Sequence, residues 1–376
     1  MSVGRLYFAF SILILLSACG REETPLVFGL SGPLTDPVGQ SIQHGAELAL
    51  LEINRQGGIG GRRLVLRSMD DHGDADSAVI VARRLRDDNS VLAVIGPAGN
   101  YTASAAAQVY GASSNPIVAV TPTATSIDFG SLGEHMFRVC PDAIVHAEGL
   151  ANWATSRLGV GNAVTLYWND EEGRSAADAF RNTLEAGGGA IVADDPFSSE
   201  LPSFEPYLAR ATRRNRVDAV AIFGNVSRIG AIAAALNTLS LRPTILGSTD
   251  LARFIPEADG MLEGAHLSSA YLTGRVSARN APFREAFRQE HGGAQPDAAA
   301  AGAYDIVYIL AQAVSAVGTD RVRIRSYLAG MGTDTEPFEG VSGTIGFDEN
   351  GNLSNPTVDI GVVRNGEVVP ADGRSP

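Results

Sequence analysis

The sequence predicts an α/β protein built from two similar units with parallel sheets, joined by a hinge that the chain crosses more than once. Two observations predict the units: short apolar runs alternate with longer segments of helical period, and this order occurs twice along the chain. A third observation predicts the hinge. Near the C-terminus, helical stretches follow one another without strands of their own, so they must pack on a sheet that is already built.

Each unit repeats the order strand, helix, strand, and each is expected to form a Rossmann-like lobe. In the first unit, strands are predicted at 26–30, 64–67, 91–95 and 117–120, with helices at 39–55, 75–87 and 102–110. In the second unit, strands are predicted at 163–167, 190–193, 217–223 and 244–246, with helices at 175–186, 204–214 and 228–239. The tail is expected to hold helices at 281–291, 298–317 and 320–329 and a β region at 341–363.

The predicted lobes are discontinuous because the tail returns to units formed earlier. Residues 26–142 and 272–340 are expected to form the first lobe, and residues 143–271 and 341–370 the second. More than one crossing between the lobes favours a defined hinge over a flexible linker.

The first 25 residues are expected to be a targeting segment and a tether. Arg5 precedes an apolar run at 6–16 that is too short to span a bilayer, which is typical of a secretory signal peptide. Small residues followed directly by Cys19 resemble the lipobox of bacterial lipoproteins, in which the cysteine thiol carries lipid. We therefore predict a lipoprotein signal peptide at 1–18, lipidation of Cys19 and a tether at 19–25. An ordinary signal peptide with an incidental cysteine is the alternative.

The composition excludes several classes of function. All 29 basic side chains of the 376 residues are arginine, and they are outnumbered by 42 acidic ones, which gives a net charge of −13. Without lysine, the chain has no Walker-A lysine and no Schiff-base lysine. Its acidic charge and scattered arginines argue against nucleic acid as a partner. If Cys19 carries lipid, Cys140 has no disulfide partner and is expected to be a buried thiol.

Three motifs that resemble cofactor or metal sites are better explained as turns and caps. The glycine-rich stretch 57–61 follows a helix and precedes a strand, the reverse of the dinucleotide fingerprint. The acidic stretch 70–76 lacks the glycine and final glutamate of a calcium loop, and the stretch beginning at Asp348 has Leu353 where that loop needs glycine. We therefore predict no cofactor, no metal site and no catalytic residue.

Polar residues follow the ends of five predicted strands, and together they form the candidate ligand site. Those that follow the strand at 91–95 lead into a helix, whose free N–H groups and positive dipole end attract a carboxylate. Carboxyl ends of strands form the ligand crevice in open α/β sheets, so the two edges together suit a zwitterion. These polar stretches are 96–102 and 121–125 in the first unit and 170–173, Asn225 and 248–250 in the second.

Several short motifs occur along the chain in a characteristic order. They are Phe28-Gly29-Leu30-Ser31-Gly32-Pro33, Asp70-Asp71, Val94-Ile95-Gly96-Pro97, Thr121-Pro122-Thr123-Ala124-Thr125, Phe137-Arg138, Gly302-Ala303-Tyr304-Asp305 and Gly346-Phe347-Asp348. These motifs and their order resemble the type I periplasmic binding proteins, specifically the leucine/isoleucine/valine-binding family that feeds ABC importers. The resemblance covers nearly all of the chain after the signal. It implies the type I fold, a binding function without catalysis, an ABC permease as partner, and a place on the periplasmic side of a bacterial cell envelope.

The resemblance also implies roles for the candidate residues of the first lobe. The ligand carboxylate falls on Asn100 and Thr125, and the carbonyl of Thr123 faces the ligand ammonium. Tyr101 and Thr102 are expected to contribute through backbone N–H groups or side chains.

The second lobe departs from the family pattern. A family tyrosine is replaced by Glu172, a family aromatic by Asn225, and the acidic residue that meets the ammonium falls on Thr249, with Asp250 one position later. Because this edge is more polar than the family pattern, the alternatives for the ligand are an amino acid, an amide and another small carboxylate. A ligand sensor on the same fold is an alternative function, and an enzyme that uses Glu171, Glu172 or Asp250 as a base is a third.

Overall fold

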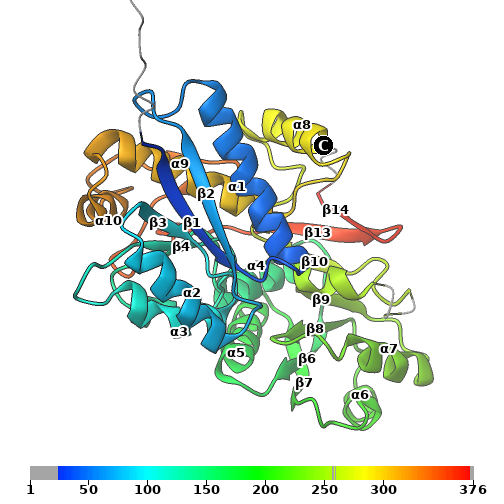
Figure 1. The fold of residues 1–376 in the computed structure, drawn as a ribbon. Helices are drawn as coiled ribbons and strands as arrows, with labels where there is room; N and C mark the ends of the chain where they lie inside the picture. The colour runs from blue at the N-terminus through cyan, green and yellow to red at the C-terminus, as the bar shows by residue number, and fades with distance from the viewer. Residues whose placement is uncertain (1–23, 256–257, 259, 373–376) are drawn as a thin grey trace, which may run out of the picture.

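The computed structural model describes residues 24–255, 258 and 260–372 and arranges them in two α/β lobes (Figure 1). The first sheet has the strand order β2-β1-β3-β4-β5, and the second has the order β14-β13-β10-β9-β8-β6-β7. The pairs of the first sheet are parallel, whereas β13 and β14 add an antiparallel edge to a parallel second sheet. The predicted α/β class and the two lobes with parallel sheets are confirmed. The predicted signal peptide and Cys19 lie outside the described residues.

The predicted strands correspond to β1 to β4 of the first sheet and β6 to β9 of the second. The first sheet consists of β1 (Leu26–Gly32), β2 (Leu64–Asp70), β3 (Val91–Ile95), β4 (Ala119–Thr121) and β5 (Met136–Arg138). The second consists of β6 (Asn162–Trp168), β7 (Ala190–Phe197), β8 (Ala219–Phe223), β9 (Thr244–Ser248), β10 (His266–Ser269), β13 (Asp359–Arg364) and β14 (Glu367–Pro370). A short ribbon is formed by β11 (Phe338–Glu339) and β12 (Thr344–Ile345).

Helices cover both faces of the first sheet because successive residues of its strands point to opposite sides. Leu26, Phe28 and Leu30 pack with α1, α9 and α10, whereas Val27 packs with α2 and α3 on the other face. The helices of this lobe are α1 (Pro37–Arg55), α2 (Ala75–Asp87), α3 (Asn100–Tyr110), η1 (Phe129–Leu132), α8 (Asn280–Glu290), α9 (Ala298–Val317) and α10 (Arg321–Ala329).

The second sheet is covered in the same way. Val164 and Leu166 of β6 pack with α6, α7 and η2, whereas the alternate residue Ala163 packs with α4 and α5. The helices of this lobe are α4 (Ala143–Ser156), α5 (Glu171–Ala186), α6 (Glu205–Thr212), α7 (Ile229–Thr238) and η2 (Thr249–Phe254).

The tail returns to the first lobe through α9, which lies against α1 (Figure 1). The two helices approach so closely that a Cβ atom at Gly45 would lie 2.1 Å from the carbonyl oxygen of Ala300. By length and composition α9 could cross a membrane, but most of it is buried inside this lobe. Its apolar sequence is therefore accounted for by its place in the core.

Within the described residues, the chain passes between the lobes three times: after β5, after β10 and before β13 (Figure 1). The third passage comes later than the predicted boundary at 341. Val341, Ile345 and Phe347 belong to the core of the first lobe, where the Phe347 ring lies 4.9 Å from that of Phe137. The apolar side chains of this segment thus pack on the first sheet, and the chain enters the second sheet only at β13.

Candidate functional site

The first edge of the site is formed by the loops that follow β3 and β4, and hydroxyl groups hold these loops together. The hydroxyl of Thr121 donates to the Pro97 carbonyl at 2.6 Å, and that of Thr123 donates to the Ala98 carbonyl at 2.6 Å. Gly96 has a positive φ, and a Cβ atom there would lie 2.0 Å from a backbone oxygen of β1. Only glycine fits this turn, which delivers the chain to the first residue of α3.

Asn100 and Thr125 of the first lobe meet Glu172 of the second lobe. The side-chain nitrogen of Asn100 donates to Oε2 of Glu172 at 2.7 Å, and the hydroxyl of Thr125 donates to Oε1 at 2.9 Å. The side-chain oxygen of Asn100 accepts from the backbone N–H of Ser126 at 3.1 Å. This bond fixes the orientation of the amide, so its nitrogen points toward the second lobe.

A buried arginine, Arg138, bonds to the loop that carries Thr125. One guanidinium nitrogen of Arg138 donates to the carbonyl of Ser126 at 2.7 Å, and another contacts Oδ2 of Asp142 at 3.3 Å. Arg138 is only 2% exposed. Arg138 thus positions the turn that carries Thr125, a role that the sequence analysis did not assign, although Arg138 belongs to one of the motifs quoted above.

Glu172 lies in the first turn of α5, where the N-cap Asp170 accepts from the Gly173 N–H at 2.8 Å. Burial raises the pKa of the Glu172 carboxyl, and the negative charges of Asp170 and Asp250 act in the same direction. The hydrogen bonds from Thr125 and Asn100 oppose that rise. Among the ion pairs formed by the described part of the chain, none involves Glu172. Its charge is met by neutral donors alone.

Two other predicted residues of the first lobe lie differently from Asn100. Thr102 is 2% exposed, and its hydroxyl bonds with the N–H and carbonyl of Gly99 to cap α3. The Thr102 side chain is therefore buried and bonded within the helix cap, and it does not lie at a solvent-facing edge. Tyr101 is 77% exposed and points to solvent.

The remaining predicted residues of the second lobe follow β8 and β9. Asn225 is exposed and accepts from the Ser227 N–H at 2.9 Å, as expected for a turn. Thr249 is half-buried at the start of η2, and Asp250 beside it is exposed. Asp250 is close enough for its charge to act on Glu172. Within the described residues, direct hydrogen bonds join only Asn100, Thr125 and Glu172 of the nine candidates across the two lobes.

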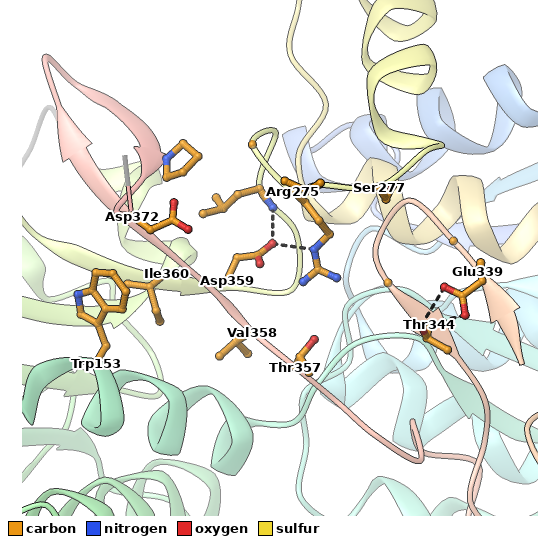
Figure 2. Close-up of a pocket in the computed structure, with 16 residues that line it drawn as sticks. Trp153, Arg275, Ser277, Glu339, Thr344, Thr357, Val358, Asp359, Ile360 and Asp372 are labelled. Atoms are coloured by element: carbon orange, nitrogen blue, oxygen red, sulfur yellow. Dashed lines mark hydrogen bonds and ion pairs between the residues drawn. The ribbon is translucent and has the colours of Figure 1, made fainter. Parts of the chain in front are cut away.

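A cavity of about 550 Å³ lies where the chain passes between the lobes, and none of the nine candidate residues lines it (Figure 2). Arg275 and Asp359 face each other there, with Nε of Arg275 2.9 Å from Oδ2 of Asp359, and Trp153 lies on the other side (Figure 2). Asp359 also accepts from the Leu272 N–H at 3.2 Å. The ion pair therefore ties the second passage between the lobes to the third.

The site offers binding chemistry of a defined kind. The described residues contain no group of three or more His, Cys, Asp or Glu side chains placed to hold a metal ion. Cys140, whose thiol is buried, donates to the Ala124 carbonyl at 3.2 Å, and burial raises the pKa of this thiol to about 12. The groups that face each other between the lobes are amide and hydroxyl donors on one side and a carboxylate on the other.

Comparisons with known proteins identify the family and the fold. A family model described as periplasmic binding protein matches residues 25–367. The Leu/Ile/Val-binding protein homolog 3 of Brucella melitensis is 26% identical over 354 residues, which cover 92% of this chain and 93% of that protein.

Solved structures of substrate-binding proteins are similar over the same span. One from Desulfitobacterium hafniense, in complex with Leu, has a TM-score of 0.81 and 26% identity and covers 92% of this chain and 100% of its own. Another from Streptococcus pneumoniae, in complex with isoleucine, has a TM-score of 0.79 and 25% identity and covers 92% of this chain and 98% of its own. These relatives are binding proteins, in agreement with the prediction that the chain is not an enzyme.

Proposed function

Because this chain belongs to the type I periplasmic binding proteins of the leucine/isoleucine/valine-binding family, we propose that it is the lipid-anchored binding subunit of an ABC importer. It takes an amino acid, or a related small carboxylate or amide, between its lobes. The observation that carries this proposal is the meeting of Asn100, Thr125 and Glu172 at the carboxyl ends of strands from both sheets.

The chemistry of the first edge suits the carboxylate of the ligand. The Asn100 amide and the Thr125 hydroxyl are fixed donors, held by Ser126 and Arg138. The start of α3 adds the positive end of a helix dipole. Donors that are already oriented lose little conformational entropy when a carboxylate binds, so they contribute affinity as well as selectivity.

The chemistry of the second edge suits the ammonium group. Glu172 and Asp250 bring two carboxylates to this edge, and the second lies in η2, directly after β9. Relatives bind leucine and isoleucine. In this chain, with an acid at Glu172 and Asn225 after β8, we expect amino acids with small or polar side chains and amides to bind as well.

Ligand binding is expected to stabilise the form in which the lobes face each other. The three passages form the hinge about which the lobes open and close. A ligand that touches both edges binds the closed form better than the open form, so it shifts the population toward closure, which an ABC permease would recognise.

A thermal-shift screen of the purified protein tests this function. Leucine, isoleucine, polar and basic amino acids, amides and aromatic carboxylates form the panel, and a ligand at a hundred times its Kd should add about 2.7 kcal/mol of stability. Asn100→Ala and Thr125→Val should abolish the shift, whereas Ser104→Ala on the exposed face of α3 should leave it unchanged. If no compound in the panel raises the melting temperature of the wild-type protein, the binding proposal is wrong.

The lipid anchor is tested separately by fractionation of cells. Cys19→Ala should release the protein into the soluble fraction, because the lipid that binds it to the membrane is missing. The matched control is Cys140→Ala, which removes the other cysteine and should leave the protein with the membrane. Membrane attachment of the Cys19→Ala protein would contradict the anchor.

A further inference from the structure

The carboxylate of Glu172 occupies both donors that the proposed function assigns to the ligand. Its Oε2 accepts from Asn100 at 2.7 Å and its Oε1 accepts from Thr125 at 2.9 Å. Each oxygen takes one donor, which is how a ligand carboxylate would use the same pair. The residue comes from the opposite lobe, so this contact also joins the two lobes.

We propose that Glu172 is an internal competitor of the ligand carboxylate: it latches the second lobe onto Asn100 and Thr125, and an acidic ligand binds only by displacing it. The competition between Glu172 and a ligand rests on the proposed function, whereas the contact of Glu172 with the first lobe does not. The latch is a property of the chain alone.

The start of α5 holds Glu172 where it reaches across. Asp170 caps the helix through the Gly173 N–H, and a Cβ atom at Gly173 would lie 2.3 Å from the Trp168 carbonyl oxygen. The first turn of α5 is therefore packed tightly on the end of β6, and the backbone position of Glu172 in this turn is fixed. The positive end of the helix dipole also favours an ionised carboxylate in this turn.

The surroundings of Glu172 keep the latch reversible. Burial and the charges of Asp170 and Asp250 disfavour its ionised form, while two hydrogen bonds from the first lobe favour it. Because these effects oppose one another, the contact holds the lobes together, but a better partner for Asn100 and Thr125 can replace Glu172.

The competition predicts which ligands succeed. When a ligand carboxylate takes the two donors, Glu172 loses both hydrogen bonds and stands near Asp250 without a cation. A ligand that carries an ammonium group can pair with the displaced carboxylate, whereas a simple anion such as acetate only replaces one carboxylate by another. The site should therefore favour carboxylates that bring their own positive charge.

The latch is tested by the distance between the lobes in the purified full-length chain without added ligand. Spin labels at Ser104→Cys on α3 and Asn182→Cys on α5, both exposed positions, report this distance by pulsed electron paramagnetic resonance in a background in which Cys19 and Cys140 are both replaced by alanine. Glu172→Ala should shift the distribution to longer distances, and so should Asn100→Ala. The double variant should shift the distribution no further than the single variants do, because both substitutions break the same contact between the lobes.

A matched control and a refuting result accompany this measurement. Glu171→Ala removes an exposed acid from the same helical turn and should leave the distribution unchanged. Melting temperatures of all variants verify that they are folded. If the distributions of Glu172→Ala and Asn100→Ala both superimpose on that of the wild type, there is no latch.

The competition is tested with acetate, a carboxylate without a cation, by nuclear magnetic resonance titration. Glu172→Ala should bind acetate about tenfold more tightly than the wild type, because no internal carboxylate has to leave. Asp250→Asn removes a nearby negative charge but leaves the donors occupied, so its effect should be much smaller. Equal acetate affinities of Glu172→Ala and the wild type overturn the competition.

The two proposals fail in different ways. If the lobes open in Glu172→Ala but no compound of the thermal-shift panel binds any variant, the latch stands and the ligand assignment fails. If ligands bind and Asn100 is needed, but Glu172→Ala neither opens the lobes nor binds acetate more tightly, the binding function stands and the latch fails.

Discussion

Asp305 is a buried carboxylate whose ionisation should make the stability of the protein depend on pH. It lies in α9 with no exposed surface, and it accepts from the N–H of Val341 at 2.9 Å and from the N–H and hydroxyl of Ser342 at 2.8 and 2.5 Å. These bonds hold the segment before β12 on the first lobe. Burial nevertheless dominates and raises the pKa of Asp305 from 3.8 to about 6.

The sign and size of the effect follow from linkage. Because the folded protein binds the proton of Asp305 more tightly than the unfolded chain does, Asp305 favours the folded state at low pH. This contribution is lost as the pH rises from about 4 to about 6 and stays lost above that. A shift of about two pKa units corresponds to about 3 kcal/mol of unfolding free energy.

The variant Asp305→Asn isolates this contribution, because its side chain does not titrate. The difference in unfolding free energy, wild type minus variant, should fall by about 3 kcal/mol between pH 4 and pH 7. Urea unfolding followed by far-ultraviolet circular dichroism suits this measurement, since both tryptophans, Trp153 and Trp168, belong to the second lobe. Asp334→Asn, at an exposed position, is the control. A difference that stays constant from pH 4 to pH 7 would refute the reasoning.

Two further predictions concern packing and a histidine. Gly45→Ala places a methyl group 2.1 Å from the carbonyl oxygen of Ala300 and should lower the unfolding free energy by about 3 kcal/mol. Urea unfolding measures this change. An unchanged unfolding midpoint would show that α1 and α9 separate easily. Burial lowers the pKa of His146 from 6.5 to about 4, so the unfolded chain binds its proton first and stability should fall as the pH drops from 6.5 to 4. His146→Gln should lack this acid loss in the same pH series, and an identical loss in the variant would contradict the assignment.

The sequence predicted β1 to β4, β6 to β9 and most helices because their apolar residues repeat with a local period. The run at 26–30 appears as β1, and the helix predicted at 298–317 appears as α9 with the same bounds. The short strands β5, β10 and β14 have no such signal. Each exists because a neighbouring strand offers unpaired backbone groups, which no local pattern records.

The candidate site was predictable in part. The rule that ligands bind at the carboxyl ends of parallel strands selected the stretches that contain Asn100, Thr125 and Glu172, and the family resemblance selected these residues within them. The three side chains meet. Thr102 was selected with them, but its position in the first turn of α3 directs its hydroxyl to the cap. Arg138 had no assigned role, because its function comes from carbonyl groups of a loop twelve or more residues away.

By itself, the sequence determined the α/β class, the repetition of the unit, the return of the tail and the residue types at the strand ends, because each depends on periodicity or on local backbone chemistry. Only the tertiary structure decided that residues 341–347 pack on the first sheet and that Glu172 bonds to Asn100 and Thr125. Apolar side chains can be buried equally well on either sheet, and a carboxylate finds its donors only when two lobes have a definite relative position. Both outcomes are set by contacts between segments far apart in the chain.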